Sequence, residues 1–367
     1  MSKTIGVIGG GQLARMMIPA AINLGLDLRV LAETAGEPAA AAVTALGDYR
    51  DIEAVFAFAE GLDVVTFDHE HVPQAVLREL VARGVNVQPG PDALQFAQNK
   101  LAMRERLADL GIPVPDWARI DTADQLAVFL ADHGGAGVLK TATGGYDGKG
   151  VRVVRDASEA ADWLAAGEPL LVEELVEFRR ELAQLVARRP GGELALWPVV
   201  ESVQRDGVCA EVIAPAPGSA GKVADVAADI ATTVAEALGV TGVLAVELFE
   251  TTDDRLLVNE LAMRPHNSGH WTIDGSTTSQ FEQHLRAVLD LPLGATGSRD
   301  PWSVMVNVFG GVSPERVPLA LADPQVKVHG YGKEPRPGRK AGHVTAGGDD
   351  LDDVVFRARA AAAFFED

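Results

Sequence analysis

Apolar and polar positions near the start of the chain alternate in short blocks. The segment "TIGVIGGGQLARMMIPAAINLGLDLRVLAET" (4–34) predicts a strand, a glycine turn, a helix and a second strand, because two short apolar runs flank a stretch with helical spacing. "LDVVTFDHEHV" (62–72) adds an apolar strand that ends in acidic residues. The chain therefore begins with a predicted βαβ unit.

A long amphipathic helix is predicted further along, over 223–239. "VADVAADIATTVAEALG" ends in a glycine, a common residue just past a helix C-terminus. Its apolar positions recur at the helical period. They are Val223, Val226, Ile230, Val234 and Leu238.

Two segments rich in Pro and Gly divide the chain. They are "VQPGPDAL" (87–94) and "LPLGATGSRDP" (291–301). We predict an N-terminal domain over 1–92, a central domain over 93–295 and a small C-terminal domain over 296–367.

Length and composition restrict the class of protein. A chain of 367 residues exceeds the size of a single hydrophobic core, so two or three domains are expected. The net charge of -20 argues against binding to nucleic acid or an anionic membrane, because such surfaces need spread positive charge. The one cysteine, Cys209, excludes an intrachain disulfide and is expected to be a small buried apolar residue. We expect a cytoplasmic protein without a membrane span.

The first glycine cluster resembles a dinucleotide-binding turn. Gly9, Gly11 and Ala14 have the required spacing, and Glu33 follows at the end of the next strand, where a ribose-binding acid belongs. Taken alone, this pattern suggests a nicotinamide-dependent oxidoreductase. A phosphate or carboxylate of another substrate would suit the same helix N-terminus equally well.

A second glycine cluster, "KTATGGYDGKG" (140–150), joins two predicted strands. A Walker loop would need a longer glycine spacing and a following helix, so this segment is not one. We interpret it as a glycine flap whose amides cover phosphates, with Lys140 pointing a charge at them. The alternative is an ordinary hairpin.

Two carboxylates are predicted to face each other across a hairpin. "GVLAVELFETTDDRLLVNELAMR" (242–264) reads as two strands around a polar turn, and symmetry about Asp253 and Asp254 pairs Glu247 with Glu260. Adjacent carboxylates repel unless a cation lies between them, and Mg²⁺ prefers such oxygen ligands together with substrate phosphates. Asn259 is expected on the opposite face unless a bulge redirects it. The alternative is two solvated acids.

Directly after this hairpin, "MRPHNSGHW" (263–271) crowds polar side chains onto one loop. Arg264, His266, Asn267 and His270 all lie within it. A planar guanidinium beside hydrogen-bonding side chains is well suited to a small planar anion such as bicarbonate or a carboxylate.

Together these segments resemble the ATP-grasp ligases, and within them the 5-(carboxyamino)imidazole ribonucleotide synthases of purine biosynthesis. "GGYDGKG", "RPHNSGHW" and "RPGRKAGH" (336–343) carry the resemblance in this order, with "EEL" at 173–175 and "NE" at 259–260. It extends from "GVIGGGQLARM" near the start over nearly the whole chain.

The resemblance implies a fold of mixed α/β and α+β class. A Rossmann-like, pre-ATP-grasp βαβ domain would precede an ATP-grasp domain with a mobile lobe at about 114–178, and a small C-terminal domain would follow. It also implies a homodimer.

The resemblance also implies residue roles. Lys100 and Lys140 would contact the ATP phosphates, and Glu247 and Glu260 would bind Mg²⁺. The other ATP-binding positions implied are Gly145, Tyr146, Asp147, Gly148, Lys149 and Gly150 of the flap, Glu173, Glu174, Leu175 and Val176 at the adenine end, Glu181 at the ribose with Gln204 nearby, and Asn259.

The remaining implied roles concern the other two substrates. Bicarbonate and the carboxyphosphate made from it would be held by Arg264, His266, Asn267 and Lys340. The 5-aminoimidazole ribonucleotide, whose exocyclic amine receives the CO₂, would contact Gln12, Glu70, Tyr146 and Asp147, with its phosphate near Lys333, Arg336 and Arg339.

Two positions depart from the family pattern. Val151 stands where a glutamine is common, and Asp68 where a glutamate is frequent.

Three other functions compete with this interpretation. They are a formate-dependent transformylase or biotin-carboxylase-like enzyme, the oxidoreductase above, and a non-catalytic nucleotide sensor. The oxidoreductase leaves the acid pair and the flap unexplained. The presence of both metal-binding acids and the bicarbonate residues argues against the sensor.

Overall fold

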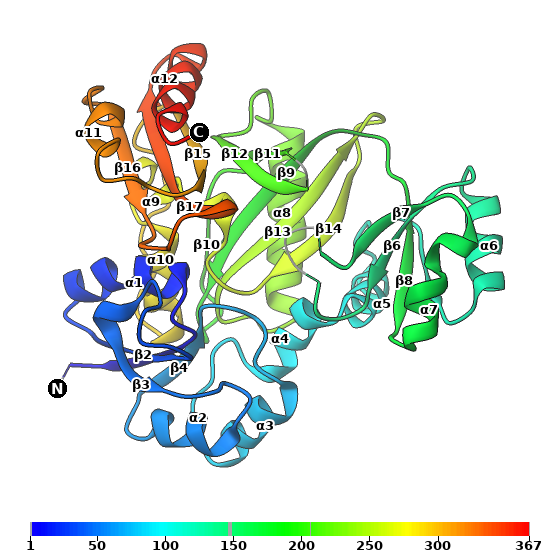
Figure 1. Cartoon of the computed structure of the whole chain (residues 1–367), viewed down its shortest axis with the longest axis horizontal. Helices are drawn as coiled ribbons and strands as arrows, with labels where there is room; N and C mark the ends of the chain where they lie inside the picture. The colour runs from blue at the N-terminus through cyan, green and yellow to red at the C-terminus, as the bar shows by residue number, and fades with distance from the viewer. Residues whose placement is uncertain (1, 146–148, 206, 367) are drawn as a thin grey trace.

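The computed structural model describes residues 2–145, 149–205 and 207–366, and these residues form three sheets with helices packed around them. Figure 1 shows the N-terminal unit in blue beside the orange and red C-terminal segment, with a green lobe at the opposite end of the molecule. None of the described helices is long and apolar enough to cross a membrane.

The N-terminal unit is a parallel four-stranded sheet in the order β3-β2-β1-β4. Its apolar strands are buried because helices cover the sheet, so Ile5, Val7 and Ile8 have no exposed surface. The predicted βαβ unit and the later apolar strand are confirmed. The elements are β1 (Thr4–Ile8), α1 (Gln12–Asn23), β2 (Asp27–Ala32), η1 (Ala40–Ala42), β3 (Val43–Leu46), α2 (Ile52–Ala59), β4 (Val64–Phe67) and α3 (Gln74–Ala82).

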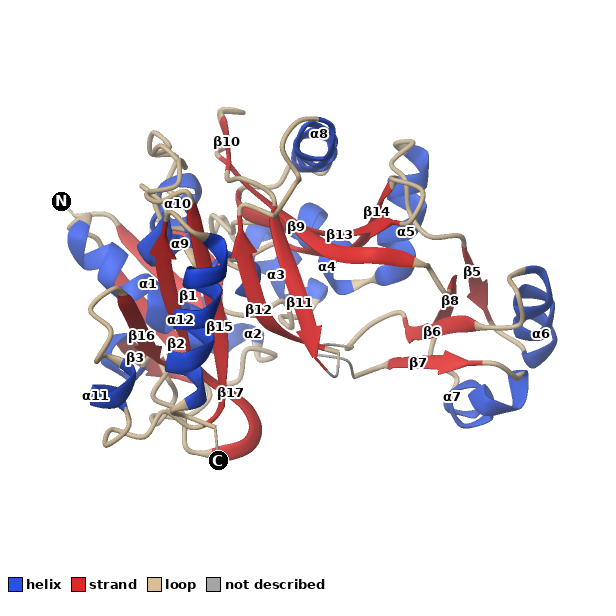
Figure 2. Cartoon of the chain, turned by 90° about the horizontal axis from the view of Figure 1, so that it is seen from above, coloured by secondary structure: helices blue, strands red, loops and turns tan. Residues whose placement is uncertain are grey.

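Helices α4 (Pro91–Gln98) and α5 (Lys100–Asp109) lead into a lobe with its own four-stranded antiparallel sheet, ordered β5-β8-β6-β7. Seen from above, this sheet stands apart from the central one (Figure 2). Its elements are β5 (Trp117–Ile120), α6 (Ala123–Asp132), β6 (Gly137–Thr141), β7 (Val151–Val154), η2 (Ala157–Ala160), α7 (Ala161–Ala166) and β8 (Leu170–Glu174). Strands β6 and β7 pair on either side of the glycine flap, as predicted.

A nine-stranded sheet forms the centre of the molecule, in the order β14-β13-β9-β11-β12-β15-β17-β16 with β10 paired to β9. Its strands are β9 (Phe178–Arg188), β10 (Leu194–Leu196), β11 (Val200–Arg205), β12 (Val208–Ala214), β13 (Gly242–Thr251), β14 (Leu256–Ala262), β15 (Trp302–Gly310), β16 (Val326–Gly330) and β17 (Arg336–Gly348). Because β12 pairs with β15, the C-terminal strands continue the central sheet rather than forming a separate one.

Helices cover this sheet and join it to the N-terminal unit. The predicted helix over 223–239 is confirmed as α8, with Ile230 and Val234 buried and Gly239 at φ +63° just past its end. The helical elements are α8 (Lys222–Ala237), η3 (Asn267–Gly269), α9 (Thr272–Gly275), α10 (Gln280–Val288), α11 (Val317–Ala320) and α12 (Leu351–Ala363).

A buried histidine on α10 fixes the N-terminal unit against the central sheet. His284 Nδ1 accepts a hydrogen bond from the Val243 amide at 3.1 Å, and its Nε2 lies 2.8 Å from Thr66 Oγ1. Burial lowers the pKa of His284 to about 3, so the ring is neutral and bridges β13 to β4. The contact holds the carboxyl ends of β1 and β4 beside the loop that follows β14.

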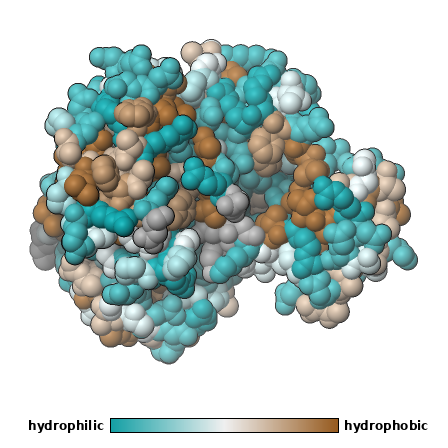
Figure 3. Space-filling view, turned by 45° about the horizontal axis from the view of Figure 1, so that its top comes forward, coloured by the Kyte–Doolittle hydropathy of each residue, from teal (hydrophilic) through white to brown (hydrophobic). Residues whose placement is uncertain are grey.

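The face of the molecule in Figure 3 is mainly hydrophilic, with scattered apolar patches. This agrees with the excess of acidic residues in the sequence. Cys209 is 8% exposed, as expected of a buried thiol.

Candidate active site

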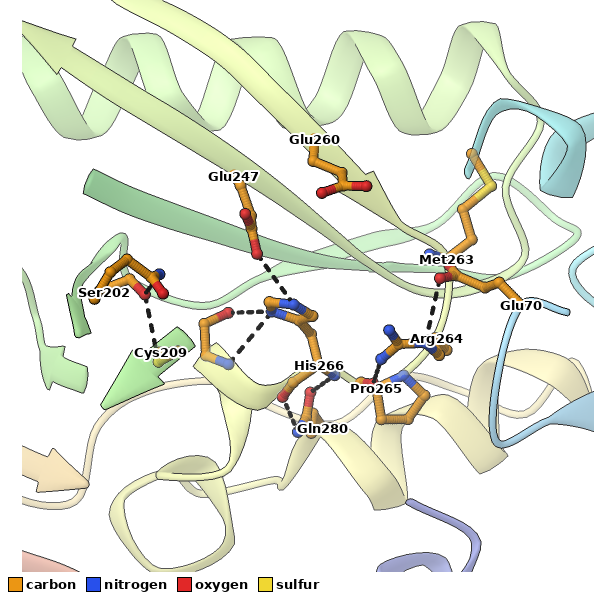
Figure 4. A network of polar contacts seen from close by, with 12 residues as sticks. Glu70, Ser202, Cys209, Glu247, Glu260, Met263, Arg264, Pro265, His266 and Gln280 are labelled. Atoms are coloured by element: carbon orange, nitrogen blue, oxygen red, sulfur yellow. Dashed lines mark hydrogen bonds and ion pairs between the residues drawn. The ribbon is translucent and has the colours of Figure 1, made fainter. Parts of the chain in front are cut away.

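The predicted pairing of two carboxylates across the β13–β14 hairpin is confirmed. Glu247 lies directly opposite Glu260 in the ladder, and Figure 4 shows both side chains projecting from neighbouring strands toward one space. The predicted symmetry of the hairpin is wrong near its tip, where Leu248 pairs with Val258. A bulge after Val258 inserts Asn259 as an unpaired residue and restores the register at Glu260.

The bulge also changes the expected direction of Asn259. Instead of pointing away from Glu260, Asn259 places Oδ1 3.3 Å from Lys140 Nζ. Glu260 Oε1 accepts a bond from Lys100 Nζ at 2.5 Å. Two lysines from different elements therefore contact two successive residues of one strand.

The Glu173 side chain is 3% exposed and faces Lys140 and Arg104 inside the structure. Its Oε2 lies 2.7 Å from Lys140 Nζ, and its Oε1 accepts a bond from Arg104 Nε at 2.6 Å. Burial alone would raise the pKa of Glu173, but the two cations lower it below its usual value. The carboxylate therefore stays ionised and holds Lys140 in place.

The residues that follow Glu173 in the chain are more accessible to solvent. Glu174 Oε1 accepts a bond from the Asp116 amide at 3.0 Å, and Leu175 is 46% exposed beside the half-buried Val176. Glu181 is hydrogen-bonded to Gln204, so these two predicted neighbours do meet. Burial and the charge of Glu247 raise the pKa of Glu181 to about 7.

The loop after β14 brings the predicted anion-binding residues together. His266 Nε2 lies 3.2 Å from Glu247 Oε1, and Arg264 Nε lies 3.3 Å from Glu70 Oε2 (Figure 4). Gln280 fixes the loop, since its amide accepts from the His266 N–H at 2.8 Å and donates to the His266 carbonyl at 2.7 Å. Glu70 also accepts from the Met263 amide at 2.6 Å.

Asn267 and Lys340 complete this cluster. Both side-chain amide atoms of Asn267 are buried without a nitrogen or oxygen partner among the described residues, a state that is costly unless a ligand or water binds there. Burial would raise the pKa of Glu247, but His266, Lys340 and Arg264 together lower it, which places the Lys340 ammonium near the same carboxylate.

The expected ribonucleotide contacts are brought together only in part. Lys333 Nζ donates to Gln12 Oε1 at 2.6 Å and to the Lys340 carbonyl at 3.0 Å, which joins the two ends of the chain. Arg336 is exposed and Arg339 is half-buried, with Arg339 donating to the Glu334 carbonyl at 3.4 Å. Tyr146, Asp147 and Gly148 lie outside the described residues, between the described Gly145 and the pair Lys149 and Gly150.

The first glycine turn is occupied by the chain's own carboxylates. Asp68 Oδ1 accepts from the Ala14 amide at 2.8 Å, and Glu37 Oε2 accepts from the Gly10 amide at 3.0 Å. A Cβ on Gly11 would lie 2.0 Å from Asp68 Oδ2. These amides are the ones a dinucleotide pyrophosphate would use, and Glu33 instead pairs with Arg50. The geometry therefore argues against the oxidoreductase.

Asp68 is expected to make stability depend on pH. Burial raises its pKa to about 6, although the Ala14 amide and Arg264 favour the charged form. The unfolded chain loses this proton near pH 4, so the folded state binds more protons between about pH 4 and 6 and its stability falls across that window as pH rises. In the parent protein, the free energy of unfolding measured with urea should fall by about 2–3 kcal/mol across this window. Asp68→Asn should abolish that fall.

The matched control is Asp92→Asn, whose carboxylate is 86% exposed. Its unfolding curve should keep the pH dependence of the parent protein. Equal pH dependence in the parent protein and Asp68→Asn would contradict the assignment of this window to Asp68.

Comparison with known proteins agrees with this geometry. Family models match at residues 1–98 (ribonucleotide synthetase preATP-grasp domain), 105–281 (ATP-grasp domain) and 303–357 (phosphoribosylaminoimidazole carboxylase C-terminal domain). The N5-carboxyaminoimidazole ribonucleotide synthase of Mycobacterium tuberculosis is 54% identical over 99% of this chain and 87% of the relative. The chain belongs to the N5-carboxyaminoimidazole ribonucleotide synthase family.

Further members of this family are similar in sequence and in structure. The synthase of Corynebacterium ammoniagenes is 51% identical over 98% of this chain and 91% of its own length. The Thermus thermophilus structure has a TM-score of 0.90 at 38% identity and covers 99% of both chains. The Aspergillus clavatus enzyme, solved with ADP and 5-aminoimidazole ribonucleotide, has a TM-score of 0.89 at 32% identity, covering 100% of this chain and 99% of that chain.

Two residues that support the site, Gln280 and Arg104, were not predicted from the sequence. Arg104 is fully buried against Glu173 and the bulge. The available signal was its spacing, because Arg104 lies four residues after Lys100 in one helix and so shares its face.

Proposed function

We propose that this chain carboxylates the exocyclic amine of 5-aminoimidazole ribonucleotide with ATP and bicarbonate, giving 5-carboxyaminoimidazole ribonucleotide, ADP and phosphate in purine biosynthesis. The observation that carries the proposal is the β13–β14 hairpin. It sets Glu247 and Glu260 between the lysines on one side and the loop of Arg264 and His266 on the other.

In the first step, a bicarbonate oxygen attacks the γ-phosphorus of ATP and ADP leaves. Lys100 and Lys140 would neutralise the phosphate oxygens, since phosphoryl transfer depends mostly on positioning and charge. Glu247, Glu260 and the adjacent Asn259 form an oxygen donor set that fits Mg²⁺. A Mg²⁺ ion held by these residues would supply positive charge that offsets the charge of the phosphates.

The same proposal assigns the far ends of ATP to the connection between the lobe and the central sheet. Glu181, with Gln204 beside it, would accept bonds from the ribose. The adenine would lie against the residues that follow β8. They are Glu174, Leu175 and Val176, together with the backbone of Glu173.

In the second step, carboxyphosphate yields CO₂ and phosphate beside the amine. Arg264, His266 and Lys340 would hold the planar carboxylate, and Asn267 offers an amide with no other nitrogen or oxygen partner among the described residues. The amine nitrogen forms the new bond to carbon, and its proton passes to the departing phosphate. Closure of the 140–150 flap would exclude the water that destroys carboxyphosphate.

The ribonucleotide would lie where the two ends of the chain meet. Lys333 and Gln12 are already joined there, and Glu70 orients Arg264 from the N-terminal side. Arg336 and Arg339 would bind its phosphate, because a planar guanidinium matches phosphate geometry. The resemblance also assigns contacts with the ribonucleotide to Tyr146 and Asp147.

The proposal is tested by measuring ADP release with each substrate omitted in turn. ADP formation should require both the ribonucleotide and bicarbonate, and the carboxylated product should appear in equal amount. ADP formed equally well with formate in place of bicarbonate, and without the ribonucleotide, would instead indicate a transformylase.

We also propose a cytoplasmic homodimer. The single cysteine is buried and cannot form an intrachain disulfide, which is compatible with a reducing compartment. Light scattering on the purified chain measures the oligomeric state directly.

A further inference from the structure

Arg104 is an arginine with no exposed surface, on a helix that faces the candidate site. Its guanidinium donates from Nε to Glu173 Oε1 at 2.6 Å, from Nη1 to the Val258 carbonyl at 3.0 Å and from Nη2 to the Asn259 carbonyl at 2.7 Å. Arginine is almost never fully buried unless its charge is paired, and here all three nitrogens have acceptors.

The two carbonyls belong to the residues at which the β14 ladder is interrupted. A bulge leaves the inserted residue without its ladder partner, so its backbone groups need another one. Arg104 supplies that partner from α5. The bulge in turn sends Asn259 to Lys140 and restores Glu260 to its place opposite Glu247.

The Arg104 guanidinium shares a carboxylate with Lys140, and its residue shares a helix face with Lys100. Glu173 is shared between Arg104 and Lys140, with the Lys140 ammonium 2.7 Å from the second carboxylate oxygen. Lys100 lies one turn earlier on α5, on the face that carries Arg104. One side chain therefore links α5, the lobe strand β8 and the central strand β14.

We propose that Arg104 is a positioning residue for the nucleotide and its metal ion, an inference that rests on the proposed function. Arg104 would act without touching either ligand, because protein acceptors use all three of its nitrogens. It fixes the bulge that aims Asn259 and Glu260, and it fixes the carboxylate that aims Lys140. Its loss should therefore weaken binding of the Mg²⁺–nucleotide complex beyond any loss of stability.

Arg104→Lys is the conservative test. Lysine keeps the charge, but its single nitrogen cannot span a carboxylate and two carbonyls as the guanidinium fork does. We expect the Kd for ADP measured by calorimetry with Mg²⁺ to rise by about tenfold or more, and the Mg²⁺ concentration for half-maximal turnover to rise with it. Without Mg²⁺, the change in Kd should be smaller.

Two further variants separate positioning from folding. Arg104→Met removes all three donors and leaves the buried Glu173 paired with Lys140 alone, so its melting temperature should fall. Arg104→Lys keeps a cation beside Glu173 and should lose less melting temperature, but it should still lose affinity for ADP with Mg²⁺. Arg359→Lys is the matched control, because Arg359 binds the buried Glu211 through two bonds of 2.7 and 3.0 Å, away from the site. It should leave both ligand readouts unchanged.

The ligand readouts decide the outcome. If Arg104→Lys loses melting temperature but binds ADP and Mg²⁺ like the parent protein, or if Arg359→Lys weakens binding equally, the inference is overturned. Binding of ADP does not require the carboxylation reaction. A parent protein that binds ADP without carboxylating the ribonucleotide would refute the proposed function while leaving Arg104 testable.

Discussion

Product formation is expected to fall by about 10²–10³-fold in Lys340→Ala, while the Kd for ATP stays within about twofold of the parent value. Lys340 lies on β17 opposite Phe309, and its charge acts on Glu247 from the side of the anion loop. The candidate ATP lysines come instead from α5 and β6. Removal of Lys340 should therefore weaken stabilisation of the bicarbonate-derived anion without disturbing ATP.

The experiment compares single-turnover product formation with calorimetric ATP binding. Arg264→Ala should give the same split, since Arg264 serves the same anion from the adjacent loop. The control is Lys327→Ala, an exposed lysine on the neighbouring strand β16, which should change neither quantity. Unchanged product formation in Lys340→Ala would remove Lys340 from the proposed mechanism.

Local patterns in the sequence were sufficient for much of the fold. Glycines after an apolar strand, helical spacing over 223–239 and a polar turn between two apolar runs each have a local physical cause. The pairing of Glu247 with Glu260 followed from the turn alone. Near the hairpin tip the strands pair one residue away from the predicted register. Glu247 still lies opposite Glu260 because the bulge at Asn259 compensates for this shift.

The errors arose where the partner is distant in the chain. Arg104 donates to the carbonyls at the bulge from more than a hundred residues earlier, and the same side chain binds Glu173. From the sequence alone, the first glycine turn could bind a cofactor. In the structure, Asp68, which directly follows β4, accepts a hydrogen bond from the Ala14 amide of that turn. The periodicity of a sequence predicts on which face of a helix or strand a side chain lies. Tertiary packing determines which residues contact that face.

The pairing of β15 with β12 also joins segments that are distant in the chain. The break at 291–301 is visible as a loop, yet nothing local states which sheet edge the following strands join. That choice places Lys333 and Lys340 beside the N-terminal unit and the anion loop. The composition of the candidate site therefore depends on a long-range pairing that sequence spacing alone does not contain.

Glu260→Gln is expected to abolish Mg²⁺-dependent turnover, with a loss on the order of 10³-fold. The amide keeps the shape of the side chain and a bond to Lys100, so the hairpin should fold as before. What disappears is one of two facing negative charges, and a neutral amide is a weaker ligand for Mg²⁺ than a carboxylate.

The measurement is turnover against Mg²⁺ concentration, together with the Kd for ADP with and without Mg²⁺. The parent protein should bind ADP more tightly with the ion, and Glu260→Gln should lose most of that gain. Glu282→Gln is the matched control, because Glu282 also pairs with a cation, Arg286, but within α10. If Glu260→Gln kept both its turnover and its Mg²⁺ dependence, the facing carboxylates would not be the metal ligands. Lys100 would then be the counter-ion of Glu260 throughout the reaction.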